Sequence, residues 1–193
     1  MVAGGVKGEP LAMVVMGVSG TGKSTLGRLL ADHWRAPFLE GDTFHSAANV
    51  AKMEAGAPLT DADRWPWLDR LGAALGEAAR GEGVAVAACS ALRHAYRARL
   101  EAAAGLPLHF AYLDTDRGEI ARRMGARTGH YMPPSLLDSQ LATLEPPAAD
   151  ECALRLDAGH APEALCREVR AWVEDLTRHP RTDDTAANVT PHP

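Results

Sequence analysis

The sequence predicts an α/β fold, a five-stranded parallel sheet with helices on both faces. Short apolar runs alternate with segments of helical spacing along the chain, and this alternation is typical of parallel strands joined by helices. A length of 193 residues suits one domain with a sizeable core. We find no internal repeat, so we expect one domain over 10–178, between a flexible glycine-rich N-terminus (1–9) and a disordered polar tail (179–193).

The first predicted strand, 11–16, leads directly into the most informative stretch of the chain. Its sequence, LAMVVM, is apolar throughout, as expected for a strand that is buried on both faces of the sheet. The next nine residues, GVSGTGKST, match the pattern G-x-x-x-x-G-K-[ST]. A helix is expected over 24–34. The pattern therefore lies between a strand and a helix, the setting in which it predicts a phosphate-binding loop.

The residue types in this loop suit a polyphosphate. Glycines let successive N–H groups turn inward towards phosphate oxygens, and the start of the helix adds its positive dipole end. Lys23 can reach the outer phosphates, and the Ser24 hydroxyl can ligate Mg²⁺. The alternative, a glycine-rich turn that binds nothing, leaves the flanking strand and helix unexplained. We expect a nucleoside triphosphate to contact Gly17, Ser19, Gly20, Thr21, Gly22, Lys23, Ser24 and Thr25.

The next elements are shorter or more polar. A second strand is predicted at 37–40, ending at Gly41-Asp42, and a weakly helical region follows over 46–55. The helix over 60–80 begins with TDAD, a run typical of helix starts, and carries apolar residues at helical spacing. The sequence GEG at 81–83 should end it.

The second half of the chain continues the alternation. The strand at 84–89, VAVAAC, is again apolar, and Pro-Pro pairs bracket one of the helices. The predicted elements are strands at 84–89, 107–113 and 152–156, and helices at 93–104, 116–125, 133–144 and 162–178.

Open parallel sheets bind ligands at the carboxyl ends of their strands. This rule should bring together Gly17–Thr25, Gly41-Asp42, Cys89-Ser90 and Asp114-Thr115. Asp42 directly follows the second strand, so its carboxylate is expected to face the cleft, where it can accept or orient the proton of a substrate hydroxyl. The alternative for Asp42 is a helix N-cap, where Asp is also favoured.

Composition and charge exclude several classes of function. The formal net charge is −5 and no basic run is present, so nucleic-acid binding is not expected. No segment is long and apolar enough to span a membrane, and the first apolar run lacks the flanks of a signal peptide. Three widely spaced cysteines predict reduced thiols in the cytoplasm. The His and Cys spacings predict no zinc site.

Several longer motifs lie outside the loop. They are EGDTFH at 40–45, NVAKM at 49–53, GAPLTDADRWPWL at 56–68, CSALR at 89–93, YR at 96–97, RTGH at 127–130, LLDSQ at 136–140 and LEPP at 144–147. Together they resemble the gluconokinase family of P-loop sugar-acid kinases, over about residues 11–175. Many families share the loop alone, whereas the motifs around Asp42 and Arg64 are specific.

The resemblance implies ATP- and Mg²⁺-dependent phosphorylation of D-gluconate at its terminal hydroxyl. The product, 6-phosphogluconate, would enter the pentose phosphate or Entner–Doudoroff route. It also implies the P-loop kinase fold with a shikimate-kinase-like architecture and a mobile lid, here about 123–133. Members are often dimers, so a homodimer stays open.

The resemblance and the substrate's chemistry together suggest the acid-binding residues. Planar guanidinium groups bind a carboxylate at two points, which indicates Arg64 and Arg97, with Arg93 third because family members often carry Lys there. His45 could bind substrate hydroxyls. Each arginine could instead be a solvated helix residue, and for Arg70 and Arg99 we adopt that reading.

The predicted lid carries two further candidates. Arg127 would meet the charge developing on the transferred phosphoryl group, and Arg123 could stack on adenine, since residues four apart share a helix face. Arg122 competes with Arg123, and the role of His130 is open. The strand at 84–89 ends without an acidic residue. Ser24 is therefore the only predicted protein ligand of Mg²⁺, with Asp42 nearby.

Two alternative functions are considered. The first is another small-molecule kinase of the same fold, of the shikimate or nucleoside-monophosphate type. The second is a GTP-dependent switch, which would typically carry Asn-Lys-x-Asp. Neither Asn49 nor Asn188 is followed by Lys, which counts against the switch.

Overall fold

The computed structural model describes residues 9–116, 118, 120 and 134–179. All five predicted strands are present and form one parallel sheet in the order β2–β3–β1–β4–β5. The strands are β1 (Leu11–Met16), β2 (Phe38–Glu40), β3 (Val84–Ala88), β4 (Leu108–Asp114) and β5 (Ala153–Asp157). The predicted α/β fold is therefore confirmed.

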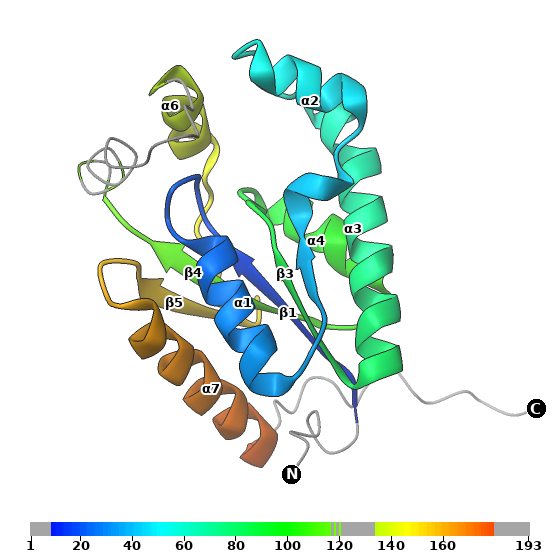
Figure 1. Ribbon diagram of the computed structural model, residues 1–193, viewed down its shortest axis with the longest axis vertical. Helices are drawn as coiled ribbons and strands as arrows, with labels where there is room; N and C mark the ends of the chain where they lie inside the picture. The colour runs from blue at the N-terminus through cyan, green and yellow to red at the C-terminus, as the bar shows by residue number, and fades with distance from the viewer. Residues whose placement is uncertain (1–8, 117, 119, 121–133, 180–193) are drawn as a thin grey trace, which may run out of the picture.

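Helices cover both faces of this sheet (Figure 1). The pair α1 (Lys23–Trp34) and α7 (Pro162–Arg178) covers one face, and α3 (Asp61–Glu82) and α4 (His94–Ala104) cover the other. The shorter elements η2 (Gly41–Phe44), α2 (Ala47–Glu54) and α6 (Pro134–Thr143) lie beyond the carboxyl ends of the strands. The predicted helix at 116–125 falls mostly outside the described residues.

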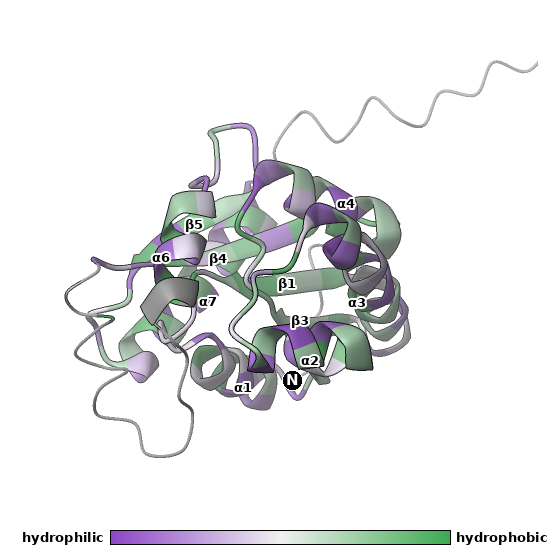
Figure 2. Ribbon diagram, turned by 90° about the horizontal axis from the view of Figure 1, so that it is seen from above, coloured by the Kyte–Doolittle hydropathy of each residue, from purple (hydrophilic) through white to green (hydrophobic). Residues whose placement is uncertain are grey.

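Strand β1 is the centre of the core, because its side chains alternate between two hydrophobic clusters. Ala12, Val14 and Met16 pack towards α3 and α4, whereas Leu11, Met13 and Val15 pack towards α1 and α7. This explains why the run is apolar without interruption. In Figure 2, β1 and β3 are hydrophobic and the hydrophilic residues gather on the surrounding helices.

Helices α3 and α4 approach each other closely at two glycines of α3. A Cβ added at Gly76 would lie 2.1 Å from the carbonyl oxygen of Ala104, and one added at Gly72 would lie 2.6 Å from that of Leu100. The helix runs to Glu82 and its C-cap is Gly83, whose φ of +79° suits a glycine. The predicted end at 80 is two residues early, and Gly83 belongs to the GEG run that was expected to stop the helix. This close packing positions the start of α3 beside the start of α4, where the candidate site lies.

Candidate active site

The loop between β1 and α1 has the conformation that its glycines predict. Gly17, Gly20 and Gly22 have φ values of +140°, +87° and +98°, a region that glycine adopts without strain. A Cβ at Gly17 would lie 2.8 Å from the carbonyl oxygen of Leu113. Substitution of Gly17 is therefore excluded by both its conformation and its contact.

Helix α1 begins in a way that suits an anion. Gly22 at its N-cap provides no side-chain cap, and no acidic residue occupies the first turn. The first intrahelical hydrogen bond of this turn runs from Leu26 N to Gly22 O, at 3.0 Å. The N–H groups ahead of Leu26 therefore lie outside the helix's own ladder, at its positive dipole end. These donors fit a polyphosphate.

The polar side chains of the loop divide into two kinds. Thr21 is buried and its hydroxyl donates to Val18 O at 3.0 Å, so it stabilises the loop itself. Lys23 Nζ donates to the same carbonyl oxygen at 2.9 Å, which holds the ammonium group against the loop. Within the described part of the chain the Ser24 hydroxyl makes no hydrogen bond, and a hydroxyl oxygen is a suitable ligand for Mg²⁺.

The backbone at Asp42 is held from two sides. A Cβ at Gly41 would lie 2.3 Å from Ala88 O, and Trp67 Nε1 donates to Gly41 O at 2.7 Å. The N-cap of α2 is Ser46, whose hydroxyl accepts from Asn49 N. Asp42 is exposed, and its carboxylate has no hydrogen bond or ion pair to any residue that the structure describes. It is thus available to a ligand, and the capping alternative gains no support.

The charges of Asp42 and Lys23 meet around Cys89, which follows β3. Burial raises the pKa of the Cys89 thiol to about 12, with a further increase from the Asp42 carboxylate and an opposing decrease from the Lys23 ammonium. Cys89 directly follows β3, so its thiol lies at the carboxyl edge of the sheet, where the loop after β1 and Asp42 after β2 also lie. The backbone reinforces this arrangement, since Gly17 N donates to Ser90 O at 3.3 Å.

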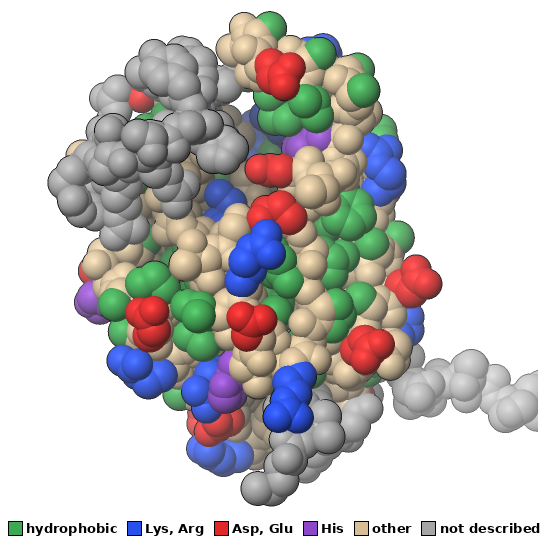
Figure 3. Space-filling model, viewed as in Figure 1, with side chains coloured by type: hydrophobic (Ala, Val, Ile, Leu, Met, Phe, Trp, Pro, Cys, Tyr) green, Lys and Arg blue, Asp and Glu red, His purple; other side chains and the backbone are tan. Residues whose placement is uncertain are grey.

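His45 follows η2 and lies just before the N-cap of α2. Its ring stacks on Trp67 with centroids 4.1 Å apart. Burial lowers its pKa; Asp42 opposes this, and Arg70 and Arg64 add to it. The imidazole is therefore neutral near pH 7 and can both donate and accept a hydrogen bond. Figure 3 shows the surface hollowed on the inner side of α2, where acidic and basic side chains gather.

Arg64 and Arg93 come together at one carboxylate, that of Asp61. Arg64 Nη1 lies 3.4 Å from Asp61 Oδ1, and Arg93 Nη1 lies 3.2 Å from Asp61 Oδ2. The Tyr96 hydroxyl donates to Asp61 and accepts from Arg64 Nη1 at 3.0 Å. The hydrogen bond from Tyr96 and the two guanidinium groups lower the pKa of Asp61. Two cations thus share one anion.

The two arginines differ in their remaining partners. Arg93 Nε also lies 3.6 Å from a second carboxylate, Glu145 Oε1, whereas Arg64 has only its share of Asp61 among the described acids. Neighbouring carboxylates therefore offset less of the positive charge of Arg64 than of Arg93, which leaves Arg64 the better partner for an acidic ligand. Sequence reasoning missed Asp61 and Tyr96 as members of this cluster. Both lie within the quoted motifs, and Asp61 was interpreted only as part of a helix start.

The structure contradicts the role that was predicted for Arg97. It was predicted to contact the substrate's carboxylate, but its side chain is only 1% exposed and lies inside the protein. Nε and Nη2 both donate to Glu151, the latter at 2.8 Å, and Nη1 donates to Ala91 O and Glu145 O at 3.0 Å each. With its donors turned inward, Arg97 joins α4 to the segment before β5.

Replacing Arg97 should therefore reduce stability. We expect Arg97→Met to lower the free energy of unfolding by about 3–5 kcal/mol, because the mostly buried Glu151 carboxylate loses the guanidinium that balances its charge. Urea unfolding measures the change. Arg99→Met on the same helix removes an exposed pair with Asp69 and should leave stability close to wild type. An equally small change for Arg97→Met would contradict the structural role.

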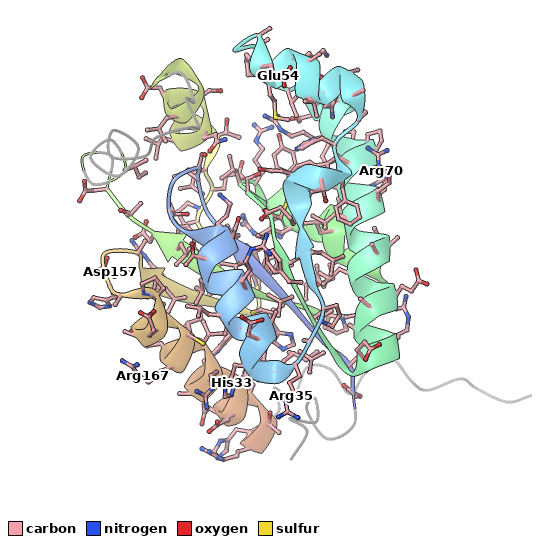
Figure 4. All side chains as sticks on the ribbon, viewed as in Figure 1. His33, Arg35, Glu54, Arg70, Asp157 and Arg167 are labelled. Carbon is pink, nitrogen blue, oxygen red and sulfur yellow. The ribbon has the colours of Figure 1, made fainter. Side chains whose placement is uncertain are left out.

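The other predicted arginines lie elsewhere. Arg70 donates to Phe44 O at 2.9 Å and lies at the outer side of α3 (Figure 4), and Arg99 pairs with Asp69. The lid candidates Arg123 and Arg127, together with His130, lie outside the described residues.

Among the described residues no group of three or more His, Cys, Asp or Glu could hold a metal ion. No described helix combines the length and apolarity that a membrane crossing requires.

Comparison with known proteins shows which family this chain resembles. A family model described as an AAA domain matches residues 13–147. A gluconokinase from Gluconobacter oxydans is 46% identical over 176 residues, which cover 91% of this chain and 94% of that protein. The similarity therefore extends over nearly the whole of both proteins.

Two solved structures are similar over nearly their whole length. A gluconokinase from Sinorhizobium meliloti has a TM-score of 0.77 and 43% identity, covering 88% of this chain and 94% of that one. An unliganded sugar kinase from a Janibacter species has a TM-score of 0.81 and 42% identity, covering 86% and 95%. Together with the loop, these matches show that the chain belongs to the gluconokinase family.

Proposed function

We propose that this protein is a gluconokinase that transfers the outer phosphoryl group of ATP to the terminal hydroxyl of D-gluconate. The proposal depends on one observation: the predicted phosphate-binding loop and the predicted acceptor-binding residue lie at the same edge of the sheet. The phosphate-type loop with Lys23 follows β1, Asp42 follows β2 in the same parallel sheet, and His45 comes three residues after Asp42. The names of the relatives reported above support the same reaction.

The loop residues and Lys23 would bind the phosphates of ATP. The amide donors at the start of α1 neutralise the inner phosphate oxygens, and Lys23 neutralises the outer ones. Ser24 would ligate Mg²⁺, which supplies positive charge to the phosphates when bound. The predicted roles of Arg127 at the transferring phosphoryl group and of Arg123 at adenine belong to the same proposal.

Asp42 would act on the substrate hydroxyl. It accepts the hydroxyl proton while the oxygen forms a bond to the outer phosphorus of ATP, and the bond from that phosphorus to the ADP oxygen breaks. The products are 6-phospho-D-gluconate, ADP and a proton. Arg64 would bind the substrate carboxylate, with Arg93 beside it, and neutral His45 would hydrogen-bond the hydroxyls.

The proposed reaction also suggests where the protein acts and which metabolic route uses its product. We place the protein in the cytoplasm, where ATP is available, and its product in the pentose phosphate or Entner–Doudoroff route. A homodimer stays a prediction. Neither a nucleic acid nor a membrane is expected as a partner.

A panel of acceptors tests the proposal. ADP release is measured with gluconate, shikimate and AMP, and we expect turnover with gluconate alone. Faster turnover with shikimate or AMP would overturn the substrate assignment. Tight GTP binding without turnover of any sugar acid would favour a switch instead.

Arg64→Ala should mainly raise KM for gluconate. A carboxylate clamp binds the ground and transition states alike, so we expect KM to rise about tenfold or more with kcat little changed. Steady-state kinetics with varied gluconate measure both constants. Arg99→Ala removes an arginine from the outer surface and is the matched control. An unchanged KM in Arg64→Ala would mean that this guanidinium does not bind the acid.

A further inference from the structure

The phosphate-type loop is already in contact with a side chain from a distant part of the chain. The backbone N–H of Ser19 donates a hydrogen bond of 2.7 Å to Gln140 Oε1, across 121 residues of sequence. Backbone N–H groups of such a loop are the donors that bind phosphate oxygens. Gln140 therefore uses a donor that belongs to the proposed nucleotide site.

This donor belongs to the peptide group that also contacts Lys23. Val18 O accepts from Lys23 Nζ at 2.9 Å, and Val18 O and Ser19 N are the two ends of one planar peptide. The lysine of this motif reaches the β- and γ-phosphates. The carbonyl and the N–H of this trans peptide point to opposite sides, so Lys23 and Gln140 flank it. Because Lys23 reaches the outer phosphates, the part of the loop that Gln140 contacts is the part expected to lie beside them.

Gln140 is the polar residue on an apolar face of α6. Residues three and four apart share a helix face, and Gln140 lies between Leu137 and Leu144 on it. Leu137 is buried in a cluster with Val18 of the loop and with Leu92. The apolar residues that pack here are Leu137 and Leu141 of α6 and Leu144, which directly follows the helix. A polar side chain on this face points to a role at the loop.

The end of α6 is anchored by contacts that do not involve Gln140. Glu145 N donates to Leu92 O at 2.7 Å, and Glu145 Oε2 accepts from His94 N at 2.9 Å. The apolar cluster holds the other end. Replacing Gln140 should therefore leave α6 in position, so the side chain itself can be tested.

We propose that Gln140 binds the outermost phosphate of ATP. Without nucleotide its Oε1 accepts from the Ser19 N–H. With ATP bound, a phosphate oxygen would replace Gln140 Oε1 as the acceptor of the Ser19 N–H. The Gln140 side chain would then donate from Nε2 to the same phosphate. One amide can do both because it carries an acceptor and two donors on a single planar group. The inference rests on the proposed function, since it requires ATP in the loop.

A specific consequence is that Gln140 discriminates ATP from ADP, because ADP lacks the outermost phosphate. The test measures the Kd of ADP and of a non-hydrolysable ATP analogue by calorimetry with Mg²⁺, and compares the ratio of the two constants. Gln140→Glu keeps an acceptor for Ser19 but replaces the donors with negative charge. We expect about tenfold or greater loss of preference for the analogue over ADP.

A second variant, Gln140→Met, keeps the proposal testable if Gln140→Glu does not fold. It keeps the length of the side chain, suits the apolar face and loses both polar groups, so the preference for the analogue should again fall. Thr143→Ala, on the same helix, loses only a hydrogen bond to Ser139 O and should keep the wild-type ratio.

The outcomes separate the two proposals. Equal changes in both Kd values in the Gln140 variants, or no change, would mean that Gln140 only packs against the loop, and would overturn the inference. A wild-type protein that binds neither nucleotide would overturn the proposed function and the inference with it.

Discussion

Lys23→Ala should reduce kcat by about 10³-fold, the upper range for removing one donor from a preorganised anion site. The ammonium group is the one side-chain cation that the described loop provides, and it is held at the loop by Val18 O at 2.9 Å. Its charge opposes the negative charge on the outer phosphates, and no described neighbour can replace it there. ADP release at saturating gluconate measures the loss.

Lys52→Ala is the matched control for this prediction. It removes the same charge from α2, where Lys52 pairs with Asp63 at 2.7 Å, and should leave kcat close to wild type. If Lys23→Ala kept turnover within about tenfold of wild type, a phosphate-binding role of this magnitude would be contradicted.

Asp42→Asn should lower kcat by about 10²-fold or more while ATP still binds. The amide has the size of the carboxylate but cannot accept the hydroxyl proton. Asp42 has no partner among the described residues, and η2 is anchored through Gly41, so the change should not disturb the fold. Steady-state kinetics give kcat, and calorimetry with a non-hydrolysable analogue gives nucleotide affinity.

Glu40→Gln provides the control for Asp42, two residues earlier in the chain. The Glu40 carboxylate lies 3.8 Å from Arg28 Nη2 at the surface, so its replacement should leave kcat nearly unchanged. Near-normal turnover in Asp42→Asn would reduce Asp42 to a structural residue. Loss of nucleotide binding would instead indicate that Asp42 acts on the loop.

Features that depend on local sequence were predictable. The uninterrupted apolar run of β1, followed by glycines and Lys23, indicated both a buried strand and a phosphate-type loop, because burial pattern and backbone conformation are local properties. Asp42 could be placed at the carboxyl edge for the same reason, since it directly follows a strand. Thr60 and Asp63 form the capping box expected of a helix start.

Arg93 and Arg97 show what could not be predicted from the local sequence. They lie four residues apart at the start of one helix, and Arg97 was ranked ahead of Arg93 as an acid-binding residue. In the structure Arg93 pairs with Asp61 at the site, whereas Arg97 is buried against Glu151. Glu151 lies 54 residues further along the chain. No local pattern encodes which of two similar cations such a distant carboxylate will reach.

The sequence by itself determined the order of the elements, the phosphate-type loop and the position of Asp42. Each of these depends on periodicity, glycine conformation or the direction of a strand, which a few neighbouring residues set. Only the tertiary structure decided that Asp61 joins two arginines, that Arg97 turns inward and that Gln140 reaches Ser19. Those contacts arise where segments 32 to 121 residues apart pack together, and packing is a property of the whole chain.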